Sequence, residues 1–91
     1  MRLTVTRTFA IAELGTVAFV GFESIELEFG TVHRVLVTRP DGESVEAVAS
    51  VEAVRQDASG EEFPALLFTS LALEDVVLGS SVFVLAEVRD A

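Results

Sequence analysis

The chain has 91 residues, which is the size of one domain, and 51% of them are hydrophobic. Its mean hydropathy of +0.54 excludes an intrinsically disordered chain, because disordered segments are poor in apolar residues. The formal net charge is -9, from 15 acidic and 6 basic residues. A field of this sign repels nucleic acids and anionic membranes, so neither is an expected partner.

The residue types exclude several further kinds of site. The sequence contains no cysteine, and therefore no disulfide, thiolate nucleophile or Cys-ligated zinc. Residues 1–7 lack the continuous apolar core of a signal peptide, and no apolar run approaches the roughly 18 residues of a membrane span. We expect a cytoplasmic protein without a cofactor or a membrane contact. The six basic residues stand singly and form no basic run: Arg2, Arg7, Arg34, Arg39, Arg55 and Arg89.

Apolar and polar residues alternate with a period of two, which predicts β-strands along most of the chain. The apolar face of the first predicted strand, residues 2–11, consists of Leu3, Val5, Phe9 and Ile11. Arg7 interrupts this face, and we expect it at a rim. Residues 13–15 predict a turn, after which residues 15–21 are expected to form the second strand.

The next segments continue the pattern. Residues 24–29 alternate as a short strand, and residues 31–39 form a β-branched run. Pro40-Asp41-Gly42 then predicts a tight hairpin, because proline presets φ and Asp-Gly tolerates positive φ. Residues 43–55 follow as a long strand. One of its faces carries small apolar side chains, which suit a crowded barrel interior: Val45, Ala47, Ala49, Val51 and Ala53.

Residues 63–71 and 81–88 differ from the earlier segments because both of their faces are apolar. Between them, residues 72–78 predict a single helical turn with Gly79 as its C-terminal cap. Several short strands at even spacing are typical of a barrel or a sandwich. The predicted fold is an all-β, antiparallel-rich, closed barrel of six to seven strands in one domain over residues 1–91.

Three groups of residues carry a resemblance to a known family. They are Phe9-Ala10-Ile11 with Gly15-Thr16-Val17 and Gly21, then the run Ala49-Ser50-Val51-Glu52-Ala53-Val54, and finally Leu66-Leu67-Phe68, Glu74-Asp75-Val76 and Gly79. Their order resembles the second-domain β-barrel of elongation factor Tu and related translation GTPases. The resemblance implies the translation-protein barrel fold, here as a stand-alone domain.

The chain departs from that family where the family meets nucleotide and tRNA. No G-x-x-x-x-G-K-S/T phosphate loop is present, so the resemblance does not extend to the GTPase. Thr69 and Ser70 stand where the family has a basic residue and a glycine. The family's Gly-Arg-x-Glu-Arg-Gly stretch, part of its tRNA surface, is replaced by Gly21-Phe22-Glu23-Ser24-Ile25-Glu26. We therefore carry over the fold and not tRNA binding.

No group of residues predicts a catalytic or metal site. Glu23, Glu26 and Glu28 form the densest acidic cluster, but no Ca²⁺-type loop surrounds them, and a solvated strand face explains them better. His33 is the only histidine. A general base needs an oriented nucleophile and a carboxylate partner, and a zinc site needs more ligands. We expect His33 to be a partly exposed strand residue.

The doubly apolar strands leave two interpretations open. Either both strands are central in the barrel with their outer faces covered, or those faces form a protein interface. The residues of the predicted interface are Phe63, Leu66, Phe68, Leu71, Phe83 and Leu85. The leading hypothesis is a non-enzymatic protein-binding module, with a protein partner or a homo-oligomer at these strands. The alternatives are a ribosome- or tRNA-associated accessory factor and a small enzyme.

Overall fold

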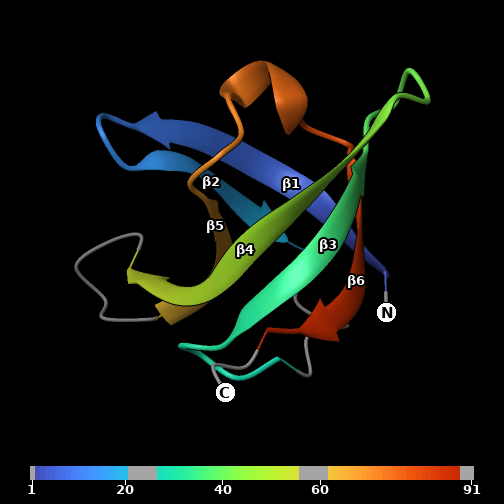
Figure 1. Cartoon of the computed structure of the whole chain (residues 1–91). Coiled ribbons are helices and arrows are strands. Elements are labelled where there is room, and N and C mark those ends of the chain that lie inside the picture. The colour runs from blue at the N-terminus through green and yellow to red at the C-terminus, as the bar shows by residue number, and fades with distance from the viewer. Residues whose placement is uncertain (1, 21–26, 56–61, 89–91) are drawn as a thin grey trace.

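The protein is a closed β-barrel. The computed structural model describes residues 2–20, 27–55 and 62–88. Within these ranges six strands pair antiparallel in the order β1-β2-β5-β4-β3-β6, and β6 pairs back onto β1 (Figure 1). The strands are β1 (Arg2–Ile11), β2 (Gly15–Val20), β3 (Val32–Thr38), β4 (Ser44–Arg55), β5 (Glu62–Phe68) and β6 (Ser81–Glu87). The predicted all-β closed barrel is confirmed.

The short helical turn is also confirmed, although its end differs from the prediction. A 3₁₀ helix, η2 (Leu73–Asp75), lies over one end of the barrel (Figure 1). Its first turn is held by Asp75, whose Oδ2 accepts a hydrogen bond of 3.0 Å from the backbone N–H of Ala72. Gly79 does not cap this helix, because the helix ends at Asp75 and Gly79 lies in a separate turn with φ +89°.

The β3–β4 hairpin forms as its turn residues predict. The backbone N–H of Gly42 donates to the carbonyl of Arg39 at 2.9 Å, and Gly42 has a φ of +93°. The strand predicted over residues 24–29 lies partly outside the described residues, and its described end, residues 27–29, is not a strand. Gly30 turns the chain there and donates its N–H to the carbonyl of Val51 at 2.7 Å.

The barrel interior combines small side chains on β4 with large ones on β5. Ala49 is the register partner of Phe68, and both are fully buried. A small residue opposite a phenylalanine leaves room for the ring on the barrel axis. The predicted inward face of β4 is confirmed from Val45 to Val51, whereas Ala53 is exposed. The other buried core residues are Leu3, Val5, Ala18, Val20, Val35, Val37, Ala47, Val51, Leu66, Val76 and Val82.

A β-bulge in β1 corrects the prediction for the first strand. Val5 pairs with Val20 and Arg7 pairs with Phe19, so Thr6 is an extra residue in β1. An extra residue reverses which side chains face inward, because the pleat has a period of two. Leu3 and Val5 therefore point into the core, whereas Phe9 and Ile11 face outward together with Arg7.

A second bulge reverses the faces of β6. Arg34 pairs with Ala86 and Val35 pairs with Val84, which makes Leu85 the extra residue. Val82 is buried and Val84 packs against the core. Beyond the bulge, however, Ala86 is exposed, and Val88 is 44% exposed. The predicted single face of residues 82, 84, 86 and 88 is therefore split between the interior and the surface.

Gly15 is the position where backbone conformation and packing both require glycine. Its φ is +142°, and a Cβ there would overlap the carbonyl oxygen of Phe68 and lie 3.0 Å from Thr69 Cα. Gly42 provides a matched comparison, because its φ is also positive but open space surrounds it.

We expect Gly15→Ala to lower the free energy of unfolding by about 3 kcal/mol or more, because the backbone of β5 has to move. Gly42→Ala should cost only about 1 kcal/mol, which is the penalty for positive φ alone. Guanidinium denaturation followed by far-UV circular dichroism measures both. Equal losses in the two variants would contradict the close packing of Gly15 against β5.

Candidate functional site

The six residues of the predicted interface fall into different environments. Leu66 is 1% exposed and Phe68 is 0% exposed, so an interface on the folded barrel does not include them. This corrects the sequence interpretation, because both side chains face the barrel axis. Leu71 is partly buried against the core. Phe63 is the register partner of Val54, and its side chain is outside the described part of the structure. Phe83 and Leu85 remain on the surface.

The outward face of β5 is covered by its neighbours. Ala65 is 1% exposed and lies in a small cluster with Val17 and Phe19 of β2. Phe9 closes one side of this cluster, with its ring centroid 5.7 Å from that of Phe19. The apolar character of both faces of β5 is therefore explained by two layers of packing, one inside the barrel and one outside it.

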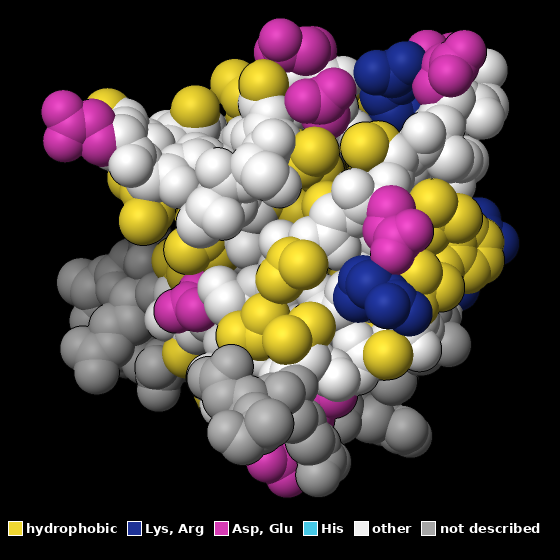
Figure 2. Space-filling model, viewed as in Figure 1, with side chains coloured by type: hydrophobic (Ala, Val, Ile, Leu, Met, Phe, Trp, Pro, Cys, Tyr) yellow, Lys and Arg dark blue, Asp and Glu magenta, His cyan; other side chains and the backbone are white. Residues whose placement is uncertain are grey.

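The outward face of β6 is exposed instead. Phe83 is 38% exposed and Leu85 is 47% exposed. Phe83 is the register partner of Leu36 on β3, and Val48 on β4, 47% exposed, lies opposite Arg34. We call these outward apolar residues the β3–β6 patch: Leu36, Val48, Phe83, Leu85 and Val88. Figure 2 shows hydrophobic side chains gathered on this face of the molecule.

The β3–β6 patch contains charges of both signs. Arg34 Nε lies 3.1 Å from Glu46 Oε1, and both side chains are more than half exposed. The guanidinium of Arg2 lies 5.9 Å from the ring centroid of Phe83, and its Nε donates to Ser81 Oγ at 3.2 Å. Glu87 is also exposed, directly before Val88. Two arginines and two glutamates thus lie beside the apolar residues, although the chain as a whole is strongly acidic.

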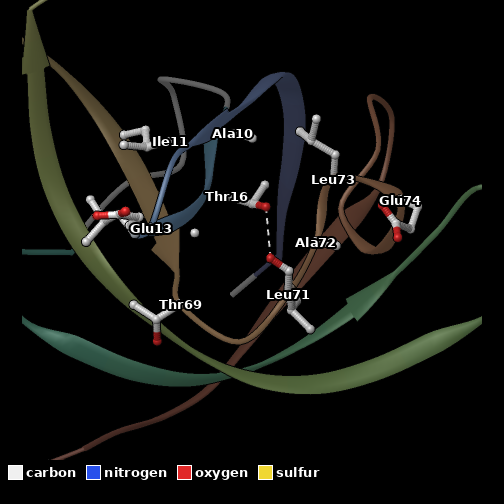
Figure 3. Close-up of a pocket in the computed structure, with 11 residues that line it drawn as sticks. Ala10, Ile11, Glu13, Thr16, Thr69, Leu71, Ala72, Leu73 and Glu74 are labelled. Carbon is white, nitrogen blue, oxygen red and sulfur yellow. Dashed lines mark hydrogen bonds between the residues drawn. The ribbon is translucent and has the colours of Figure 1, made fainter.

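A second surface feature lies at the barrel end beside η2. A groove of about 460 Å³ separates the β1–β2 turn from the segment of residues 69–74 (Figure 3). Three of its apolar side chains are well exposed, namely Ile11 (38%), Leu14 (46%) and Leu73 (40%). Glu13 and Glu74 line it on opposite sides, and no lysine or arginine lines it. We call this feature the barrel-end groove.

The two walls of the groove are tied together by one buried hydrogen bond. Thr16 is 1% exposed, and its Oγ1 donates to the carbonyl of Leu71 at 2.9 Å (Figure 3). Glu13 is held in the β1–β2 turn with φ +67°, which is uncommon for a residue other than glycine. The groove could not be predicted from the sequence, because the residues that join its two walls are 55 positions apart in the chain. The available indication was the pair of apolar residues Ile11 and Leu14 at the β1–β2 turn.

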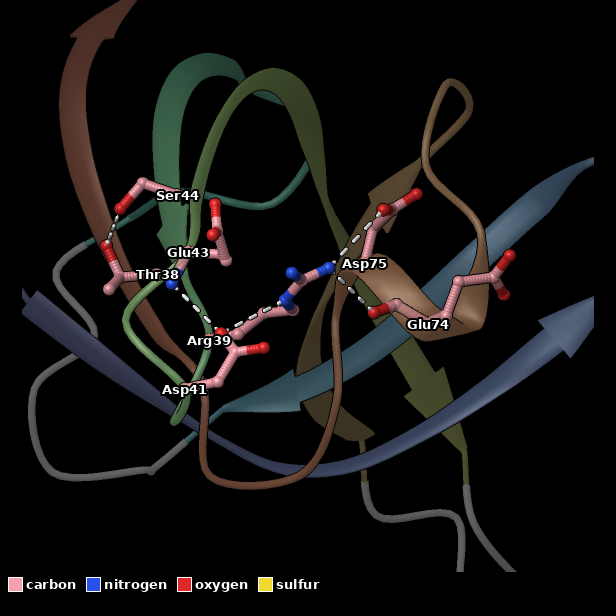
Figure 4. Close-up of polar contacts among 7 residues, drawn as sticks. All are labelled: Thr38, Arg39, Asp41, Glu43, Ser44, Glu74 and Asp75. Carbon is pink, nitrogen blue, oxygen red and sulfur yellow. Dashed lines mark hydrogen bonds and ion pairs between the residues drawn. The ribbon is translucent and has the colours of Figure 1, made fainter.

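Arg39 anchors the segment behind the groove to the β3–β4 hairpin (Figure 4). Its Nη1 donates to the carbonyl of Glu74 at 3.4 Å and lies 4.0 Å from Asp75 Oδ1. Its Nε lies 3.4 Å from Asp41 Oδ1, which also accepts 2.9 Å from the backbone N–H of Glu43. The Glu43 N–H, followed by Arg39, lowers the pKa of Asp41 below its ordinary value.

His33 is buried, which corrects the expectation of a partly exposed residue. It is 6% exposed, and its Nε2 lies 2.9 Å from Thr31 Oγ1. Because that hydroxyl donates to the carbonyl of Glu28 at 2.6 Å, His33 Nε2–H is the donor in its bond to Thr31. Nδ1 has no hydrogen-bond partner among the described residues. His33 is therefore a buried strand residue, and Thr31 is the residue to which it is hydrogen-bonded.

The remaining predicted features carry no site in the described part of the chain. Glu28 is exposed, while Glu23 and Glu26 lie outside the described residues. Residues 2–20, 27–55 and 62–88 contain no group of three histidines or acids placed to hold a metal ion. No helix among them has the length and apolar character needed to cross a membrane. Comparison with protein-family models, curated proteins and solved structures gave no match.

The different placement of Phe68 and Phe83 has a direct consequence for stability. We expect Phe68→Ala to lower the free energy of unfolding by about 3–5 kcal/mol, because it leaves a cavity on the barrel axis. Phe83→Ala should cost about 1 kcal/mol, since its side chain is already in partial contact with water. Chemical denaturation of the two variants distinguishes the environments, and similar losses would contradict the placement.

Asp41 predicts a pH dependence of the β3–β4 hairpin. Because its folded pKa lies below the ordinary value of 3.8, the ionised carboxylate favours the folded state. This contribution is present above the ordinary pKa and disappears as the pH falls through the lowered one. The difference in stability between the wild type and Asp41→Asn should therefore shrink toward low pH. An NMR titration of the Asp41 carboxyl with a midpoint at or above pH 3.8 would refute the lowered pKa of Asp41.

Proposed function

We propose that the protein is a non-enzymatic protein-binding module and that the β3–β6 patch is its contact surface. The observation that carries the proposal is the exposure of Phe83 and Leu85 on β6 and of Val48 on β4, with the Arg34–Glu46 ion pair between them. Exposed apolar side chains that cluster on one face of a domain often mark a protein contact. A phenylalanine flanked by arginine is also the residue composition that protein interfaces favour.

The charges around the patch favour a second copy of the chain as the occupant. Two molecules that each carry a net charge of -9 repel one another across most relative orientations. At the β3–β6 patch the described charged residues include two arginines, Arg2 and Arg34, beside Glu46 and Glu87, so acids and bases are nearly balanced there and this repulsion is weaker. A two-fold contact of the patch with itself also lets Arg34 of each copy approach Glu46 of the other.

The family resemblance supports the same assignment. In translation GTPases related to elongation factor Tu, the second-domain barrel packs against neighbouring domains through its outer surface. A barrel of that kind presents an outer face suited to protein contact, and we propose that this chain uses such a face for its own partner. The matching residues include turn glycines such as Gly15 and core positions such as Leu66 and Phe68, which bear on the fold and not on tRNA.

Association with the ribosome or tRNA is the alternative that the resemblance implies. Three of the described arginines offer little support for it, because Arg34 and Arg39 are paired with carboxylates and Arg2 lies over the ring of Phe83. Arg7 is exposed but stands alone. An electrostatic contact with RNA is strongest at low ionic strength. Binding of tRNA at low salt that weakens steeply with added salt would favour this alternative over the protein-binding module.

Self-association through the patch predicts a concentration-dependent sedimentation coefficient. We expect the wild type to form dimers at high concentration and Phe83→Glu to remain monomeric and folded, because a charge in the patch opposes its burial. Leu78→Glu is the matched control, since Leu78 is 66% exposed and lies outside the patch. Interference optics are needed because the chain has neither Trp nor Tyr. A wild type that stays monomeric throughout would remove the second copy as the occupant.

A further inference from the structure

We infer that the barrel-end groove is a second, independent binding site and that it takes a basic amphipathic helix of another protein. The juxtaposition behind this inference is an apolar floor between two unpaired carboxylates, built from the β1–β2 turn and the segment of residues 69–74. The groove shares no residue with the β3–β6 patch.

The apolar part of the groove provides room for aliphatic side chains. Ile11, Leu14 and Leu73 each expose between 38% and 46% of their surface around a space of about 460 Å³. The groove is shallow and open to solvent, which suits the side chains of a protein segment better than an enclosed small molecule. Burial of these three side chains under a partner removes apolar surface from water and supplies the driving force for binding.

The charges of the groove select the sign of the partner. Glu13 stands on the β1–β2 turn, and Glu74 stands across the groove on η2 (Figure 3). Neither carboxylate has a hydrogen-bond or ion-pair partner among the residues that the structure describes. Arg39 contacts Glu74 through its backbone carbonyl only. A partner with lysine or arginine on both sides of its apolar residues therefore complements the groove, and a phosphate backbone does not.

The pattern of apolar and acidic side chains indicates the form of the partner. Each described strand is paired on both sides over part of its length, and residues 7–11 of β1 pair with β2 only. The exposed apolar side chains between two carboxylates favour recognition through side chains, as when an amphipathic helix lays its apolar face into a groove. A helix whose leucines fall at positions i, i+3 and i+4 presents such a face with its lysines on either side.

The groove is already formed in the absence of a partner. The Thr16–Leu71 hydrogen bond joins its two walls, and Gly15 packs directly on the backbone of β5 beneath it. Asp75 closes the first turn of η2 and is held near Arg39. The groove therefore loses little conformational entropy when a partner binds, which favours affinity for a short segment.

The test uses the whole chain and a defined probe. The probe is a fluorescein-labelled peptide of lysine and leucine, with leucines at helical spacing over roughly three turns. Two comparison peptides serve as controls. In the first, glutamate replaces every lysine, and in the second, serine replaces every leucine. We expect saturable binding of the lysine–leucine peptide by fluorescence anisotropy at low ionic strength, and weaker binding of both comparison peptides.

Two variants with matched controls locate the contact. Glu13→Gln with Glu74→Gln should weaken binding by about five- to tenfold, while Glu28→Gln with Glu52→Gln changes the net charge equally and should leave it within about twofold. Leu73→Ser should weaken binding by about tenfold, and Leu78→Ser, on an exposed residue outside the groove, should not. Far-UV circular dichroism confirms that each variant is folded.

Chemical-shift mapping with ¹⁵N-labelled protein supplies the decisive readout. Perturbations at residues 10–16 and 69–74 support the inference. Perturbations centred on Phe83 and Leu85, equal affinity for the glutamate–leucine peptide, or tighter binding of a uridine oligonucleotide at the same residues would each overturn it. Phe83→Glu should leave peptide binding unchanged, so a failure of the groove is distinguishable from a failure of the β3–β6 patch.

Discussion

Two extra residues, one in β1 and one in β6, determine which apolar side chains of these strands face outward. Thr6 in β1 and Leu85 in β6 are β-bulges, and each reverses the faces of the residues that follow it. The first bulge turns Ile11 outward, where it lines the barrel-end groove. The second places Leu85 itself on the surface and gives the β3–β6 patch its shape. Both candidate surfaces thus depend on a local break in the pleat.

The interior depends on a contrast of residue sizes. Phe68 occupies the barrel axis because Ala49 lies opposite it and Gly15 allows the neighbouring turn to approach the backbone of β5. Thr16 follows Gly15 in β2, and its hydroxyl donates to the carbonyl of Leu71 and joins the two walls of the groove. The packing that stabilises the core therefore also sets the distance between the two walls of the groove, so a change in the core is expected to be felt there.

Closure of the barrel and the acidity of the chain together restrict what the protein can bind. The exposed apolar side chains lie on the outer face and at a barrel end. These two regions differ in charge. Arg2, Arg34, Glu46 and Glu87 lie at the β3–β6 patch, for which we propose a second copy of the chain, whereas Glu13 and Glu74 border the groove, for which we propose a basic partner. One small barrel can therefore present two surfaces with different preferences.

Features that depend on neighbouring residues could be predicted from the sequence. Period-two alternation predicted the strands and the all-β barrel, Pro40-Asp41-Gly42 predicted the hairpin, and the alanines of residues 43–55 predicted a crowded interior. The remaining features depend on contacts between strands that are distant in the chain. A bulge arises from the pairing of two strands, so the outward positions of Phe9 and Val88 have no local signal. Phe68 and Phe83 have similar sequence contexts, because both lie in strands that are apolar on both faces. The neighbouring strands determine that Phe68 is buried and that Phe83 is exposed.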